Sequence, residues 1–91
     1  MRFTVTRLCG GRALMATSKE ELNVDMEKAY AFISCEGAVK SREDLMMTAE
    51  WRGMEITLYP QGKVMFFPLS DKDTAVKYAA EILLGAGAAG D

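Results

Sequence analysis

Ile56-Thr57-Leu58-Tyr59-Pro60-Gln61-Gly62-Lys63-Val64-Met65-Phe66-Phe67 is the stretch that decides the fold. Apolar residues occupy alternate positions on both sides of Pro60-Gln61-Gly62, as expected for two strands that each bury one face. Proline presets the backbone for the second position of a turn, and glycine can adopt a positive φ. The stretch therefore predicts a β-hairpin, with one strand over residues 54–59 and its partner over residues 63–69.

A third strand is predicted immediately before this hairpin, over residues 44–51. Strand alternation divides it into one face with Leu45, Met47, Ala49 and Trp51 and another with Met46, Thr48 and Glu50. The short Arg52-Gly53 connection joins it to the hairpin. Together the three runs predict an antiparallel meander that buries one of its faces.

The beginning of the chain predicts a further strand, which starts near Phe3 and ends at Cys9-Gly10-Gly11. Residues 12–17 allow two interpretations. They return as the second strand of a hairpin, or they lead directly into a helix, because alanine and methionine are poor strand formers.

Two helices are predicted from capping signals and helical spacing. Ser18-Lys19-Glu20-Glu21 has the spacing of a capping box and predicts the start of the first helix, with Asp25 as an alternative start and Gly37 as its end. Its apolar stripe is Leu22, Met26, Ala29, Tyr30 and Ile33. The second helix is predicted over residues 71–84, capped by Ser70-Asp71. Its buried stripe is Ala75, Val76, Ala79, Ile82 and Leu83.

The predicted fold class is α+β, a two-layer sandwich of an antiparallel sheet with two helices packed on one face. The element order is β-α-β-β-β-α, with an extra strand near residues 12–17 under one of the two interpretations. Residues 1–84 are expected to form a single domain, because a chain of 91 residues has no room for two cores. The Gly/Ala-rich tail, residues 85–91, is expected to be disordered.

The composition of the chain indicates its cellular compartment and argues against some classes of partner. No stretch approaches the ~18 apolar residues that span a bilayer, and the amino terminus lacks the apolar segment of a signal peptide, so we expect a cytoplasmic protein. The two cysteines are therefore expected to be free thiols, with Cys35 a small buried residue. The net charge of −2 argues against nonspecific binding to nucleic acid.

No catalytic motif is recognisable, and we expect a noncatalytic protein without a cofactor. The chain has no histidine, so its two cysteines have no base to activate them and cannot complete a zinc site alone. The tail matches the dinucleotide-binding glycine pattern only formally, because a helix precedes it instead of a strand. Gly10, Gly11 and Arg12 could hold an anion, although a Gly-Gly pair after a strand is more often only a turn.

The sheet face that the helices do not cover is the most informative surface. If Leu58, Val64 and Phe66 point to the helices, alternation places five residues on the opposite side. These candidate partner-binding residues are Tyr59, Met65, Phe67, Met46 and Thr57. An exposed apolar patch of this kind marks a partner surface or a self-association surface. The alternative is that the hairpin twists, or the first strand folds over it, so that Met65 and Phe67 belong to the core.

The hairpin from Ile56 to Phe67, followed by a capped helix, resembles one half of a TATA-box-binding protein. It also resembles a group of small archaeal proteins with that fold. The resemblance covers residues 44–84, and the first half only by element order. In that family the residues that correspond to Tyr59, Met65 and Phe67 line the concave face that meets DNA. Three differences argue against DNA binding here: one half-repeat instead of two, the negative net charge, and carboxylates at Glu50 and Glu55.

Three functions remain open from the sequence. The leading hypothesis is a noncatalytic binding module that uses the open sheet face for a protein partner or for a homodimer. The second is a specific nucleic-acid-binding protein, by analogy with the TATA-binding fold. The third is a protein or enzyme that holds a small ligand in an apolar pocket between sheet and helices.

Overall fold

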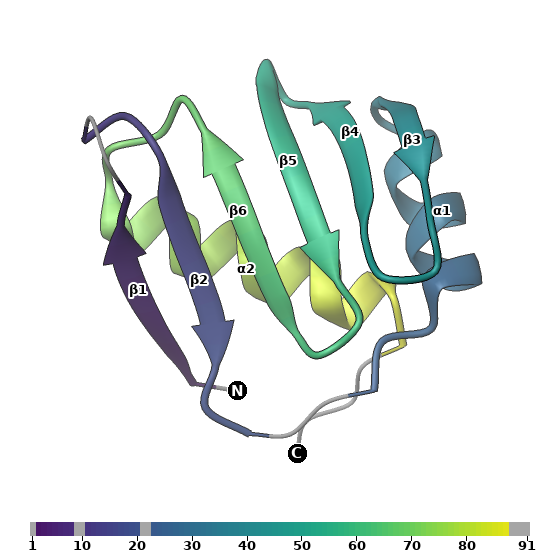
Figure 1. The fold of residues 1–91 in the computed structure, drawn as a ribbon, viewed down its shortest axis with the longest axis horizontal. Helices are drawn as coiled ribbons and strands as arrows, with labels where there is room; N and C mark the ends of the chain where they lie inside the picture. The colour runs from purple at the N-terminus through teal and green to yellow at the C-terminus, as the bar shows by residue number, and fades with distance from the viewer. Residues whose placement is uncertain (1, 9–10, 21–22, 88–91) are drawn as a thin grey trace.

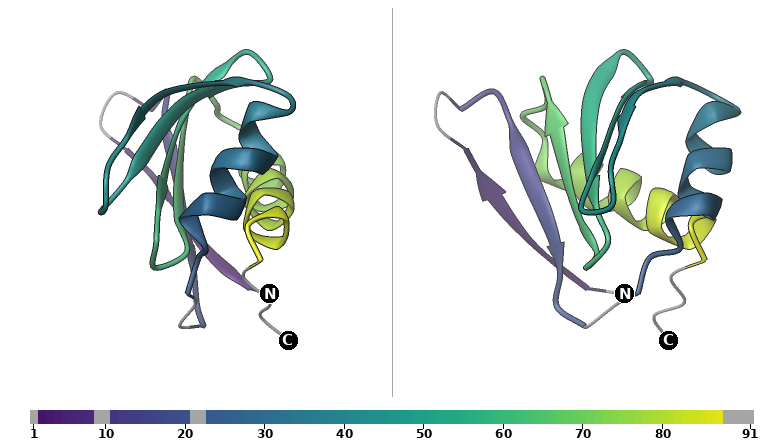
Figure 2. Two further views of the ribbon diagram at one scale, coloured as in Figure 1. Left: turned by 90° about the vertical axis from the view of Figure 1, so that its right-hand side faces the viewer. Right: turned by 45° about the vertical axis from the view of Figure 1, so that its right-hand side comes forward.

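The computed structural model describes residues 2–8, 11–20 and 23–87. Its strands are β1 (Phe3–Arg7), β2 (Leu14–Ser18), β3 (Ala38–Arg42), β4 (Met47–Trp51), β5 (Met54–Tyr59) and β6 (Lys63–Phe67). Its helices are α1 (Met26–Ser34) and α2 (Lys72–Gly85). The strands form one antiparallel sheet in the order β1-β2-β6-β5-β4-β3 (Figure 1). Both helices lie on the same side of this sheet (Figure 2, left), so the predicted α+β sandwich is confirmed.

Strand β2 settles the open question about residues 12–17, because the extra strand is present. It pairs with β1 on one side and with β6 on the other. Leu14 and Ala16 are fully buried, whereas Met15 and Thr17, which alternate with them, are only half-buried. This alternation is the signature of a strand with one core face, and it outweighs the weak strand propensity of alanine and methionine.

Strand β3 was not predicted from the sequence. It is short, most of its side chains are exposed, and it contains a register shift between Val39 and Ser41, around Lys40. An edge strand that buries little shows no apolar alternation, so the sequence carries no periodic signal for it. The chain here leaves α1, and β3 pairs with β4 at the far edge of the sheet.

The first helix begins at the alternative start. The carboxylate of Asp25 caps α1, accepting hydrogen bonds from the backbone N–H groups of Glu27 and Lys28 at 3.0 and 3.3 Å. The prediction of a capping box at Ser18 is wrong, because Ser18 is the last residue of β2 and its hydroxyl bonds to the backbone of Glu20 instead. A serine can serve a turn with the same local hydrogen bond that it uses at a cap.

The meander agrees closely with the prediction, with shorter strands. Strand β4 begins at Met47 and not at Asp44, and Leu45 is 75% exposed. Arg52 and Gly53 both have positive φ, at 51° and 79°, as a two-residue type I′ hairpin turn requires. Strand β6 ends at Phe67, two residues earlier than predicted.

Helix α2 is capped by Asp71, as predicted, and includes Gly85. Ala86 follows as the C-cap and is fully buried, whereas residues 88–91 of the predicted disordered tail lie outside the described residues. The predicted stripe is correct except for Val76, which is 36% exposed, while Tyr78 packs partly against the core. Within the described part of the chain, neither helix is long and apolar enough to cross a membrane.

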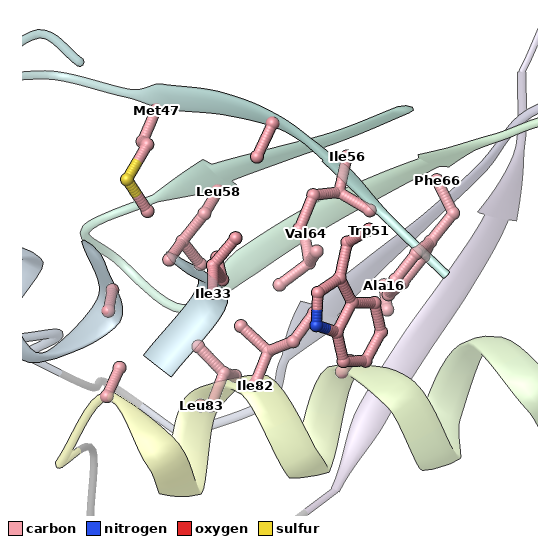
Figure 3. Packing of buried hydrophobic residues seen from close by; sticks show 14 of the residues in the cluster. Ala16, Ile33, Met47, Trp51, Ile56, Leu58, Val64, Phe66, Ile82 and Leu83 are labelled. Atoms are coloured by element: carbon pink, nitrogen blue, oxygen red, sulfur yellow. The ribbon is translucent and has the colours of Figure 1, made fainter. Parts of the chain in front are cut away.

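The core fills the space between the helix-facing side of the sheet and the two helices (Figure 3). Sheet residues at alternate positions are fully buried there, including Leu14, Ala49, Ile56, Leu58, Val64 and Phe66. The helices contribute Ala29, Ile33, Ala75, Ala79, Ile82 and Leu83. Tyr30, predicted for the buried stripe of α1, is instead exposed. Its ring lies under the guanidinium of Arg42, at 5.0 Å from the centroid.

We predict that Gly37→Ala destabilises the fold strongly. A Cβ at Gly37 would lie 2.0 Å from the backbone oxygen of Glu50, a contact that no change of side-chain rotamer can relieve. The expected loss is about 3 kcal/mol, the upper end of overpacking costs. Gly53→Ala is the matched control, because its added Cβ would meet no atom within 4 Å and the cost is only the strain of the positive φ, about 1 kcal/mol. Chemical denaturation of both variants tests this, and an equal loss in the two would contradict it.

Candidate functional site

The uncovered side of the sheet carries a row of residues that the strand register aligns. Thr57 on β5 is opposite Met65 on β6 and opposite Thr48 on β4, and Met65 is opposite Met15 on β2. Their neighbours along each strand point into the core, so these four side chains face away from the helices. We call this side of the sheet the open face.

Thr57 marks the centre of the open face. Only 4% of it is exposed, although no helix covers this side of the sheet. The flanking side chains on the face, including the half-buried Met65 and Thr48, must therefore provide the cover. The centre of the open face is thus a packed layer of methionine and threonine, only part of which water reaches.

One end of the open face is aromatic and positively charged. Tyr59 on β5 is opposite Lys63 on β6, and both are half-buried. The ammonium of Lys63 lies 5.8 Å from the centroid of the Tyr59 ring, within the range of a cation–π interaction. Met46 borders this end. It directly precedes β4, and its carbonyl oxygen accepts the hydrogen bond from Glu43 N–H that closes the β3–β4 turn.

The other end of the open face carries charges of both signs. Phe67 is 42% exposed and lies opposite Glu55, which is paired with Lys40 at 3.0 Å. The hydrogen bond to Glu55 raises the pKa of Lys40 above its ordinary value. Glu50 lies on β4, opposite Glu55 in the register, and is also exposed. The methionine and threonine centre is therefore bordered at this end by one ion pair and a further carboxylate.

The structure places the predicted partner-binding residues as follows. Thr57, Tyr59, Met65 and Phe67 share the open face, and Met46 borders it. Sequence reasoning missed Met15, Thr17 and Lys63 as members of the same face, and it grouped Thr48 with Met46 by alternation without naming Thr48 as a candidate. Their alternation with buried residues was visible in the sequence, but the pairing of β2 with β6, which brings Met15 beside Met65, was not.

The weak anion site at Gly10, Gly11 and Arg12 gains no support from the described residues. Gly10 lies outside them, as does Cys9. The guanidinium of Arg12 lies over the ring of Phe67 at 5.8 Å, and the Gly11 carbonyl accepts a hydrogen bond from Arg7 at 3.3 Å. Arg12 is thus placed beside the open face.

A second cluster gathers around Arg52, in the turn between β4 and β5. Its guanidinium stacks on Trp51 at 4.1 Å and lies 5.0 Å from the centroid of Tyr78. It also donates hydrogen bonds to Glu36 and to Glu81, the latter at 2.9 and 3.3 Å. Both carboxylates raise the pKa of Arg52, chiefly through hydrogen bonds, so this side chain stays charged. The arrangement ties the β4–β5 turn to α2 and to the turn that follows α1.

A shallow pocket of about 210 Å³ lies beside this cluster. It is lined by Glu36, Gly37, Ala38, Glu50, Trp51, Arg52 and Gly53. Ligand pockets are larger, about 300–1,000 Å³, and mostly apolar. Glu36 and Arg52 already pair with each other, and the pocket is smaller than a typical ligand site.

The Trp51 indole is buried, and its N–H has no hydrogen-bond partner among the described residues. Figure 3 shows the indole on the core side of the sheet, with its nitrogen near Ile82. The edge-to-face contact with Tyr78, at 5.4 Å between ring centroids, holds the ring in place. The unpaired N–H is thus a cost of packing in the core.

Cys35 is the one cysteine among the described residues. Cys35 is the C-cap of α1 and is exposed, so the expectation of a small buried residue was wrong. Among residues 2–8, 11–20 and 23–87, no three cysteine or carboxylate side chains come together as a metal-binding group.

Comparisons of this chain with protein-family models, with curated proteins and with solved structures found no match.

We predict that the Arg52 cluster makes stability depend on pH through Glu36. The hydrogen bond from Arg52 lowers the pKa of Glu36 in the folded state, although partial burial opposes this shift. A carboxyl group with a lowered folded-state pKa stabilises the fold above its unfolded-state pKa, and this contribution is lost as the pH falls through the folded-state pKa.

The test compares the free energy of unfolding of the native chain and Glu36→Gln over a pH series. Glu36→Gln should be less stable at pH 7, and the two curves should converge in acid, where the native carboxyl is also protonated. A difference that is independent of pH would show that Glu36 contributes through packing alone.

Proposed function

We propose that this chain is a noncatalytic binding module that uses the open face of its sheet to hold a protein partner or a second copy of itself. The observation that carries the proposal is the layer of methionine, threonine and aromatic side chains on the side of the sheet that neither helix covers. A free sheet face is ordinarily polar, and a contiguous apolar patch on a surface usually marks an interaction site.

The side chains of the open face fit a protein surface better than a small ligand. Met15 and Met65 are unbranched and can adapt their shape to a partner. Tyr59 and Phe67 can anchor an interface from opposite ends of the face. The surrounding charges, Lys40, Glu50 and Glu55, form the polar rim that interfaces commonly have. The partner is therefore expected to present apolar side chains flanked by groups of both charges.

The resemblance to half of a TATA-box-binding protein supports the same surface, because it points to Tyr59, Met65 and Phe67. It supports DNA binding less, since Glu50 and Glu55 are exposed on the open face. Carboxylates there repel phosphates. We also propose that the module is cytoplasmic, a compartment in which its cysteines would remain free thiols.

The proposal predicts that Phe67→Glu abolishes binding through the open face and leaves the chain folded. Phe67 is partly exposed, and the nearby Arg12 supplies a countercharge that offsets Glu55. Val76→Glu is the matched control, because it puts the same charge on an exposed apolar residue of α2, which packs on the other side of the sheet. Light scattering should show a native dimer that only Phe67→Glu splits, or affinity capture should yield a partner that only Phe67→Glu loses.

A partner that both variants still capture would refute the open-face proposal, and a dimer that both variants retain would show that the copies pair through another surface. An unfolded Phe67→Glu, as judged by circular dichroism, would place Phe67 in the core and remove the exposed patch on which the proposal depends.

We further predict that duplex and single-stranded DNA do not bind measurably at low salt. The net charge is −2, and the carboxylates on the open face disfavour a phosphate backbone. A fluorescence-anisotropy titration of labelled DNA at two salt concentrations checks this. Binding that weakens as salt rises would instead favour the nucleic-acid hypothesis.

A further inference from the structure

The two edges of the sheet differ in how they are protected. The outer edges belong to β1 and β3. Strand β3 has an irregular register around Lys40, and it carries Lys40 and Arg42, which are paired with Glu55 and Glu27. Irregular register and charge are devices that keep an edge strand from pairing with another chain.

Strand β1 is less protected, because it has no register shift and its one charged residue, Arg7, is at its end. Its register with β2 is regular over all five residues, from Phe3 opposite Ser18 to Arg7 opposite Leu14. Beyond it, in the described part of the chain, no strand continues the sheet, as the right-hand view of Figure 2 shows.

The hydrogen-bond pattern shows which backbone groups of β1 are free. Lys19 N–H bonds to Arg2 C=O and Leu8 N–H bonds to Ala13 C=O, at 2.8 and 2.9 Å. Along an antiparallel strand, every second residue directs its backbone N–H and C=O groups to the same neighbouring strand. The even-numbered residues of β1 therefore bond to β2. Phe3, Val5 and Arg7 therefore present their backbone N–H and C=O groups outward.

These three residues can pair with the same three residues of a second copy, with Val5 at the centre of the pair. If a second β1 lies antiparallel with Val5 opposite Val5, then Phe3 of each copy lies opposite Arg7 of the other. Each facing pair can exchange both of its backbone hydrogen bonds. A parallel pairing would put Arg7 beside Arg7, and like charges directly opposite are destabilising.

The side chains favour the same arrangement. Phe3 and Val5 are half-buried and pack against the margin of the core, so a second copy would cover their remaining surface. The guanidinium of Arg7 would meet the Phe3 ring across the pair, a cation–π partner. Thr4 and Thr6, both exposed, would face each other on the open side.

We infer that two copies of this chain pair antiparallel through β1, centred on Val5, and join their two six-stranded sheets into one. The inference does not depend on the open-face proposal, because the edge and the face are different surfaces. Its consequence is that the two open faces lie side by side and form one surface of double width.

The decisive variant is Val5→Pro. The Val5 N–H points away from β2, and proline is tolerated in an edge strand where its missing N–H faces solvent. The monomer should therefore fold, while the central hydrogen bonds of the pair are lost. Val5→Thr is the control, because it keeps the N–H and the β-branched shape.

Light scattering from micromolar to millimolar concentration should show the native chain and Val5→Thr reaching twice the mass of a folded, monomeric Val5→Pro. A native chain that stays monomeric throughout, or a dimer that Val5→Pro leaves intact, overturns the inference. A dimer split by Phe67→Glu but not by Val5→Pro does so as well, and supports open-face pairing instead.

Amide hydrogen exchange of the native chain decides the matter if Val5→Pro fails to fold. Pairing predicts that the outward-pointing N–H of Val5 becomes protected as the protein concentration rises. The same amide exchanging rapidly at every concentration overturns the inference.

Discussion

The whole structure depends on one constraint, which is that two helices can cover only one face of the sheet. At 1.5 Å per residue, the fourteen residues of α2 extend about 21 Å. The outer strands of a six-stranded sheet are about 24 Å apart, so α2 nearly spans the sheet width. It contacts β1, β2 and β6 as well as α1, whose shorter length covers the β3 end. One face becomes a dry core, and the other is left open.

Small residues let this single layer of helices lie close to the sheet. Ala75 and Ala79 of α2 and Ala29 of α1 are completely buried, and such side chains allow the helix backbones to approach large strand residues such as Phe66. Trp51 fills the space where the small residues end, held between Tyr78 and the Arg52 turn. Because Arg52 also bonds to Glu36 and Glu81, the helical layer and the sheet are clamped at the β4–β5 turn.

The sequence predicted those parts of the fold whose residues alternate strongly. The meander of β4, β5 and β6 and the capped α2 were recognised, because burial on one face leaves a clear periodic pattern. Strand β3 was missed because an exposed edge strand needs no such pattern. The start of α1 was misplaced because Ser18 uses at the end of β2 the local hydrogen bond that a helix cap would use.

The open face could be predicted only in part for a related reason. Alternation assigns Thr57, Tyr59, Met65 and Phe67 to one side of their own hairpin, which is a local property. The neighbours that complete the face are contributed by β2, and that contact joins residues about fifty positions apart. Alternation within each strand cannot specify such a pairing. The register therefore emerges only when the whole sheet is assembled over its core.

The composition of the open face disfavours nonspecific association with other proteins. Thr57 and Thr48 interrupt the methionines, so the centre of the face offers hydroxyl groups as well as apolar surface. The Lys40–Glu55 pair requires a partner either to match the charges or to leave them in water. A partner surface that is entirely apolar would neither match these charges nor leave them in water. Under the proposed function, selectivity on this face would come from its polar groups, and its methionines and aromatics would supply the binding energy.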